Sequence, residues 1–414
     1  MMLKKKVLAA ALGAMMISSS AFAVELAPAG KGDLLIAPFF MTAGGWQTDL
    51  KVINTNTTDS VVAKVVFHAP DNSAEILDFL IFLSPGDVWT GKVVTNADGS
   101  VGVSSDDDSS ITTSTMGNNC PAATGTAGFD PTRAKFTVPV GTGYVTIFET
   151  RMIRGLGAAP VAKSAILASY SASCSAGTAF GAADTDNVLT GSVTLRNPTS
   201  QGDELSLPMT ALANYDNLAY HTVGALTSFA NNAALSSKAQ VEDAIWASNF
   251  VIPYNNAAGQ YTFGIVTFPT KETYNGSAFT QYSAFGVGTG SPTVSYAVRN
   301  EEELVLGTVG CSFSPCAPGS TLRLPNEVNL VSIATGGSIS SSTNSLVYTQ
   351  TYTKGWVNAA IQSEASDTRS NANYNNFGMA GAPALTSYLI WNATSGGLKG
   401  SWMYAPATFT PGAY

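Results

Sequence analysis

Histidine and charged residues are scarce in this chain. Among 414 residues there are only two histidines, His68 and His221, and charged side chains make up 12% of the sequence, against roughly 25% in ordinary soluble domains. The chain has no G-x-S-x-G nucleophile motif, no H-E-x-x-H zinc motif and no P-loop. Neither histidine neighbours a nucleophile motif, so we do not expect a histidine general base. We predict that the protein is not an enzyme and that it has no catalytic or cofactor-binding residues.

Carboxylates are the remaining route to catalysis or to metal binding. A pair of acids can hydrolyse a glycosidic bond, and the acids available for such a pair are Asp78, Asp87, Glu149 and Glu242. We interpret all of them as acids at turns, at strand edges or on a helix surface. The segment "SSDDDSS", with Asp106, Asp107 and Asp108, offers the hard oxygen ligands that Ca²⁺ prefers, but it lacks the spaced ladder of a calcium loop. We interpret it as a solvated acidic loop.

Basic residues are fewer than acidic ones, 20 against 28, which gives a net charge of −8. A chain without a basic patch has no electrostatic footprint for nucleic acid or anionic lipid. Serine, threonine, asparagine, glycine and alanine take the place of the missing charges. Such neutral polar surfaces suit close contacts between like subunits, because few charges must be desolvated. They suit equally well the surface of an exported protein that binds no partner.

The first 23 residues have the three parts of a secretory signal peptide. Lysines at positions 4–6 precede an apolar core from Val7 to Met16, and "AFA" at positions 21–23 supplies small residues before a cleavage point. We therefore expect export to the cell surface or the extracellular space, with a mature chain of residues 24–414. No later run is long and apolar enough to predict a membrane-spanning helix.

Cysteine is also sparse, and an exported chain favours disulfides. The four cysteines are Cys120, Cys174, Cys311 and Cys316, and four thiols allow three pairings. The segment "CSFSPC" predicts a local Cys311–Cys316 clip on a hairpin loop, which leaves Cys120 with Cys174. Metal binding is the rival interpretation, but paired C-x-x-C spacing is missing and only two histidines are available to help.

Alternating apolar residues are the main signal that is present. Val61, Ala63, Val65 and Phe67 share one face of a segment whose other face is mixed, which predicts a half-buried strand. Residues 75–83 repeat the pattern, with Leu77, Phe79, Ile81 and Leu83 facing inward. The "SPGD" that follows predicts a turn in which Gly86 adopts positive φ. Consecutive strands joined by short turns indicate an antiparallel meander.

Similar segments continue to the end of the chain. Some fifteen strands, one of them "AILASYSASC" from residue 165, and a minor helix near residues 237–248 predict an all-β protein made of antiparallel sandwiches. Residues 96–133 contain almost no large apolar side chain and predict a long surface loop, in which Asp98 and Gly99 could form a hairpin turn. Because strand segments are evenly spaced across the middle, we expect one compound β-sandwich domain over residues 24–414.

Several segments resemble a group of exported bacterial proteins that are labelled hypothetical or cell-surface proteins. They are, in order, "GDLLIAPFF", "GGWQTDLKVINT", "VVAKVVF", "ILDFLIFLSPGDVWTG", "VTFPTKETYN", "LPNEVNLVSI" and "KGWVNAAI". The resemblance touches segments from residue 32 to residue 361, extends over most of the mature chain and implies an exported, surface-associated protein. It assigns no catalytic residue.

Three hypotheses follow for the function. The first is an exported structural or cell-surface protein that assembles with itself into a layer or filament, because strand edges can pair between subunits. The second is a carbohydrate-binding or adhesive module that contacts a cell-surface glycan, which requires aromatic residues gathered on one face. The tryptophans to consider are Trp46, Trp89, Trp246, Trp356, Trp391 and Trp402. The third is an outer-membrane β-barrel, whose strands should run about ten residues, whereas the last eleven residues contain Pro406, Pro411 and Gly412.

Overall fold

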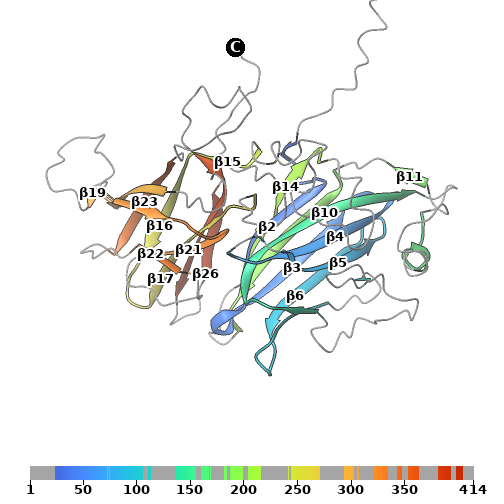
Figure 1. The fold of residues 1–414 in the computed structure, drawn as a ribbon, viewed down its shortest axis with the longest axis horizontal. Coiled ribbons are helices and arrows are strands. Elements are labelled where there is room, and N and C mark those ends of the chain that lie inside the picture. Colours follow the sequence, from blue (N-terminus) through green and yellow to red (C-terminus); the bar gives the residue numbers. More distant parts are fainter. Residues whose placement is uncertain are drawn as a thin grey trace, which may run out of the picture.

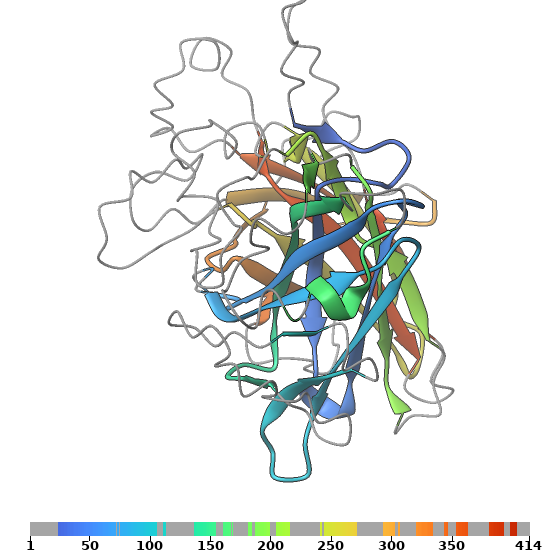
Figure 2. The ribbon, with the colours of Figure 1, turned by 90° about the vertical axis from the view of Figure 1, so that its right-hand side faces the viewer.

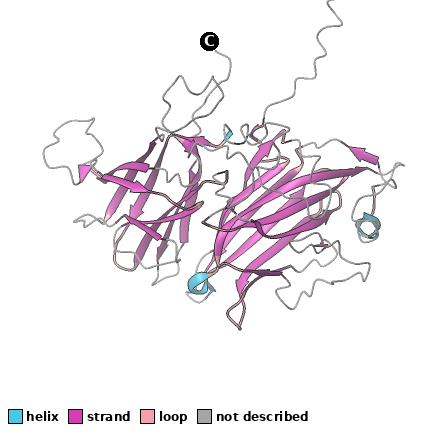
Figure 3. Cartoon of the chain, in the orientation of Figure 1, coloured by secondary structure: helices cyan, strands magenta, loops and turns pink. Residues whose placement is uncertain are grey.

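Strands dominate the computed structural model of this chain (Figure 3). It describes residues 24–71, 73, 75–105, 111–112, 136–154, 160–166, 168, 181–183, 187–198, 204–215, 241, 244–270, 293–302, 305–306, 320–333, 343–346, 353–362, 381–392 and 398–403. The predicted all-β class with antiparallel sandwiches is confirmed. The described residues form 26 strands where the sequence predicted roughly fifteen, because several strands are only two to four residues long.

The first sandwich consists of two sheets, which lie on the right of Figure 1. Sheet I has the order β1-β14-β2-β10-β4-β5-β8, with β11 paired to β10, and sheet II has the order β13-β12-β3-β6-β7-β9. The strands of sheet I are β1 (Glu25–Leu26), β2 (Leu34–Met41), β4 (Ser60–His68), β5 (Glu75–Leu83), β8 (Ile111–Thr112), β10 (Thr142–Arg154), β11 (Gly181–Ala183) and β14 (Thr210–Ala213). Those of sheet II are β3 (Gln47–Asn54), β6 (Val88–Thr95), β7 (Val101–Ser104), β9 (Phe136–Val138), β12 (Leu189–Arg196) and β13 (Leu205–Pro208).

The second sandwich lies on the left of Figure 1 and also has two sheets. Sheet III has the order β16-β23-β18-β19, with β20 paired to β18, and sheet IV has the order β22-β21-β17-β25-β26. Their strands are β16 (Asn249–Asn255), β17 (Gln260–Thr267), β18 (Thr293–Asn300), β19 (Val305–Leu306), β20 (Ser320–Arg323), β21 (Val328–Ile333), β22 (Thr343–Leu346), β23 (Lys354–Gln362), β25 (Leu385–Asn392) and β26 (Leu398–Met403). A small sheet joins β15 (Trp246–Ala247) to β24 (Ala382–Pro383), and β21–β22 is the one parallel pair among the described strands.

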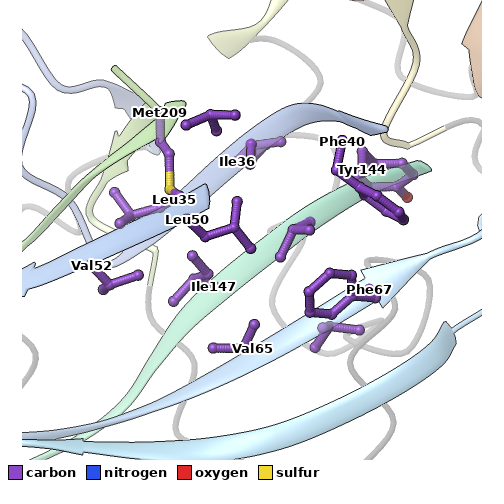
Figure 4. Packing of buried hydrophobic residues seen from close by; sticks show 14 of the residues in the cluster. Leu35, Ile36, Phe40, Leu50, Val52, Val65, Phe67, Tyr144, Ile147 and Met209 are labelled. Atoms are coloured by element: carbon purple, nitrogen blue, oxygen red, sulfur yellow. The ribbon is translucent and has the colours of Figure 1, made fainter. Parts of the chain in front are cut away.

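The predicted inward faces of β4 and β5 are confirmed. Val61, Ala63, Val65 and Phe67, together with Leu77, Phe79, Ile81 and Leu83, belong to the core cluster between sheets I and II. The ring centroid of Phe79 lies 5.8 Å from that of Trp89 on β6, so the two sheets interlock through aromatic side chains. Figure 4 shows part of this cluster, with Leu50 and Val52 of sheet II drawn with Leu35 and Ile147 of sheet I.

The central strands β17 and β21 of sheet IV are largely buried on both faces. Val266, Val331 and Ile333 face sheet III, whereas Phe263, Ile265, Leu330 and Leu389 belong to the core cluster of the first sandwich. Thr267 donates a 2.6 Å hydrogen bond from Oγ1 to the carbonyl of Pro38, and the amide of Val328 donates to the carbonyl of Pro70. Hydrophobic packing and buried hydrogen bonds therefore join the two sandwiches into one four-sheet arrangement.

Turns agree with the local sequence, and Gly86 has the predicted positive φ, 72°. Gly99 also has positive φ and closes a β6–β7 hairpin. Strand β7 therefore lies inside the range predicted to be a loop. The alternation of Val101 and Val103 with glycine was too short to predict a strand there. Residues 106–110 and 113–133 of that range lie outside the described residues.

A 3-10 helix, η1 (Ala43–Gly45), lies between β2 and β3, and two α-helical segments differ from the prediction. Val241 and Ala244 are helical, but residues 246 and 247 form β15, so the helix predicted to reach residue 248 ends earlier. Residues 163–166 are helical where "AILASYSASC" was predicted to begin a strand, because alanine favours a helix once tertiary packing permits it. Ile166 packs on the outer face of sheet I, and this helix is green in Figure 2.

Candidate functional site

The outer face of sheet I carries a buried polar cluster. Lys64 and His68 alternate with the core-facing residues of β4, on the face that the sequence predicted to be mixed and half-exposed. All nine residues of β4 are buried, so the prediction of a half-buried strand is wrong. Alternation reveals which side chains share a face, but it does not reveal whether further chain covers that face.

Lys64 is the centre of this polar cluster. Its side chain is 0% exposed, and its Nζ lies 2.6 Å from Oδ2 of Asp78 and 3.7 Å from Oε1 of Glu75. Asp78 lies opposite Val66 in the β4–β5 ladder and is therefore a diagonal neighbour of Lys64 on the same face. The antiparallel register thus brings one amine and two carboxyl groups together inside the protein.

His68 lies one strand repeat beyond Val66 on the same face. Its Nδ1 is 3.2 Å from the carbonyl oxygen of Ser73, and its Nε2 is 2.8 Å from Oγ1 of Thr146. A carbonyl oxygen only accepts, so Nδ1 carries the proton and Nε2 accepts from the threonine hydroxyl. Burial lowers the pKa of His68 to about 4, the bond to Ser73 opposes this shift, and the charge of Lys64 adds to it.

Tyr144 links this cluster to the second sandwich. Its ring stacks on His68, with centroids 4.4 Å apart and planes inclined by 10°. Its hydroxyl lies 2.8 Å from Oγ of Ser73 and 3.1 Å from the carbonyl oxygen of Pro269, which follows β17. The phenol has one proton, so donation to Pro269 and acceptance from Ser73 satisfy both contacts. Since both ring nitrogens of His68 are engaged and the residue is buried, the arrangement holds the imidazole neutral and in place.

Other acids considered from the sequence lie in different surroundings. Asp87 accepts from the amide of Ser84 in the β5–β6 turn and contacts Nζ of Lys163 at 2.6 Å, which agrees with a turn acid. Asp78 and Glu149 are buried inside sheet I, so their interpretation as turn, edge or surface acids is wrong. The structure brings His68 and Asp78 together around Lys64. Sequence reasoning did not identify Lys64, because its importance depends on strand register.

Several predicted sites lie outside the described residues. These are the four cysteines Cys120, Cys174, Cys311 and Cys316, the acidic segment with Asp106, Asp107 and Asp108, and also His221, Glu242 and the signal peptide of residues 1–23. The predicted disulfides and the Ca²⁺ alternative therefore stay predictions. Within the described ranges, His, Cys, Asp and Glu side chains form no group of three or more that could hold a metal ion.

The tryptophans are spread over the molecule. Trp89 is buried in the first core, and Trp46 packs edge-on against Trp391 at the junction of the sandwiches, with centroids 5.7 Å apart. Trp246 begins β15 and is partly buried. Trp356 is partly exposed and lies opposite Pro253 and Arg299 in sheet III. The described indole rings therefore do not gather on one face as a glycan platform would require.

Strand β16 is an open edge of sheet III among the described strands, except at Asn255, whose backbone amide and carbonyl bond to Oγ1 of Thr262. It pairs with β23 on one side, and no described strand pairs with its other side. The carbonyl of Ser248 accepts from the amide of Ile361 on β23. Because backbone groups point alternately to the two sides of an antiparallel strand, those of Asn249 and Val251 point away from β23. Val251 is 42% exposed, and the strand "NFVIPYN" contains no charged residue.

Comparison with known proteins found no matching family model, no matching curated protein and no matching solved structure. No helix in the part of the chain that the structure describes is long and apolar enough to cross a membrane.

Proposed function

We propose that this chain is an exported structural protein of the cell surface that associates with copies of itself through strand β16. The observation that carries the proposal is the open, charge-free edge of sheet III. At seven residues, β16 is the longest edge strand among those described; β26 is next and contains Lys399. The signal-peptide pattern and the low charge content of the sequence support export and close contact between copies.

Antiparallel pairing of two β16 strands about a two-fold axis suits this edge. If Phe250 lies opposite its own copy, Asn249 of each subunit pairs with Val251 of the other, and the pairs exchange backbone hydrogen bonds. Pro253 has no amide proton and therefore limits the length of the ladder. The short contact is weak in solution and gains strength when many copies are held together on a surface.

A charge placed on the edge tests the proposal. Val251→Lys adds a lysine beside the open backbone groups, and Val88→Lys is the matched control. Val88 is similarly exposed, at 36%, but belongs to β6 of sheet II, where it lies opposite Ile53 of β3 and outside the β16 edge. Sedimentation velocity over a concentration series should show self-association that V251K weakens by about tenfold, equivalent to about 1.4 kcal/mol, and that V88K leaves unchanged.

Salt dependence and cell fractionation complete the test. Because the edge carries no charge, association should change little between roughly 0.05 and 1 M salt. Protein isolated from the cell exterior should begin at Val24. A chain that stays monomeric at every concentration and forms no array on cells contradicts the assembly. A chain that keeps Met1 and stays inside the cell contradicts export.

The carbohydrate-binding alternative ranks second. It requires several exposed aromatic rings on one surface, and Trp356 is the single partly exposed tryptophan on the outer face of sheet III among the described residues. Binding of purified protein to cell-surface glycans that is lost in Trp356→Ala and kept in V251K would reverse this ranking.

A further inference from the structure

The Lys64 cluster has the composition of a condensation site. A primary amine touches one carboxyl group, a second carboxyl group lies within 3.7 Å, and the amine and its closest acid are removed from water. In the register of sheet I, Lys64 lies opposite Phe148 of β10 and Leu80 of β5, which are both buried. An ordinary ion pair in such apolar surroundings loses much of its Coulomb energy to desolvation. A covalent amide avoids that cost because it carries no charge.

The geometry permits a bond between the two side chains. Diagonal neighbours on antiparallel strands have Cβ atoms about 7–8 Å apart, a distance that an extended lysine and a short aspartate bridge without moving the backbone. The 2.6 Å contact between Nζ of Lys64 and Oδ2 of Asp78 places the amine next to the carboxyl carbon. Reacting groups held this close need little further loss of entropy to react.

We propose that Lys64 and Asp78 form an intramolecular isopeptide bond, with Glu75 as the proton carrier. Proton transfer from Nζ of Lys64 to the carboxylate of Asp78 across the 2.6 Å contact gives a neutral amine and a carboxylic acid. The Nζ lone pair then attacks Cγ of Asp78 and forms the C–N bond. Glu75 accepts one proton from the nitrogen and delivers it to the hydroxyl oxygen on Cγ. The C–O bond breaks, one water molecule leaves, the amide remains, and Glu75 returns to its carboxylate form.

This bond joins β4 to β5 within the first sandwich. It closes the chain between residues 64 and 78 and so restricts the unfolded state, as a disulfide does. Exclusion of water protects the amide from hydrolysis and favours its formation. The inference depends on the Lys64 cluster alone and is independent of the assembly through β16.

Mass spectrometry provides the test. After reduction of disulfides, the intact purified protein should be lighter than its sequence by the mass of one water molecule. A protease digest should contain a branched peptide that joins Lys64 to Asp78, with no tryptic cleavage after Lys64. An internal control is the Lys163–Asp87 pair, which has the same 2.6 Å contact but side chains that are 17% and 22% exposed. That pair should yield two separate peptides.

Variants separate the two bonded residues, Lys64 and Asp78, from the proton carrier, Glu75. Lys64→Arg keeps the positive charge and Asp78→Ala removes the acceptor, and both should restore the full sequence mass. Glu75→Gln keeps the shape of the proton carrier and should lower, at least several-fold, the fraction of newly synthesised protein that has lost water at a fixed time. A wild-type protein of full mass, with separate Lys64 and Asp78 peptides, overturns the proposal whether or not the variants fold. A mass loss that persists in Lys64→Arg overturns it as well.

Discussion

Protonation of His68 should make the stability of this protein depend on pH in a way that one substitution removes. The pKa of the folded-state ring is lowered from 6.5 to about 4 by burial, so between these pH values the unfolded chain binds more protons than the folded chain. Stability therefore falls as pH falls through this window, and the full contribution of the neutral ring is present above about pH 6.5. The total loss at pH 4 is about 3 kcal/mol.

Near pH 5 the unfolded histidine is almost fully protonated and the folded one is almost fully neutral, which predicts a slope of about 1.2 kcal/mol per pH unit from this residue. Denaturant unfolding should be measured at several pH values from 8 to about 4, on the wild type and on His68→Gln. All other titratable groups are the same in both proteins, so the difference between the two curves isolates His68.

Loss of ring stacking on Tyr144 should lower the whole curve of His68→Gln by a constant amount. The pH-dependent part should be flatter than in the wild type by about 3 kcal/mol between pH 7 and pH 4. Parallel curves for the two proteins would refute the reasoning, because they would show that the folded ring takes up its proton as readily as the unfolded one.

Four further substitutions test the packing, each by denaturant unfolding. A Cβ on Gly143 would collide with a backbone carbonyl of β4, so Gly143→Ala should lower the free energy of unfolding by about 3 kcal/mol. Gly86 has positive φ but lies in open space, so Gly86→Ala should lower it by about 1 kcal/mol. Equal losses would contradict the close approach at Gly143. Thr267→Val removes the buried hydrogen bond to β2 and should cost about 1–3 kcal/mol, and no loss would show that this bond does not hold the sandwiches together. Arg154→Ala breaks an ion pair with Asp59, but Arg154 is 58% exposed, so the loss should stay below about 1 kcal/mol.

Local residue patterns were sufficient to predict the fold class and the inward faces of individual strands. Val61 to Phe67 and Leu77 to Leu83 alternate with period two, and this alternation alone selects the side chains that meet sheet II. The turn at Gly86 was equally local, because only a few residue types accept its positive φ. The helical segment at residues 163–166 was predicted wrongly, since its helix depends on packing against sheet I rather than on periodicity.

What the sequence determined by itself is therefore the all-β class, the core-facing residues of long strands such as β4 and β5, and the pattern of an export signal, all of which depend on neighbours within a few positions. Tertiary structure alone decided that the second face of β4 is covered, that Lys64 meets Asp78 and Glu75, and that one side of β16 has no partner among the described strands. These features depend on strand register and on the packing of distant segments. Because a strand presents the same alternation whether its polar face meets water or another layer, the buried cluster is visible only after the chain has folded.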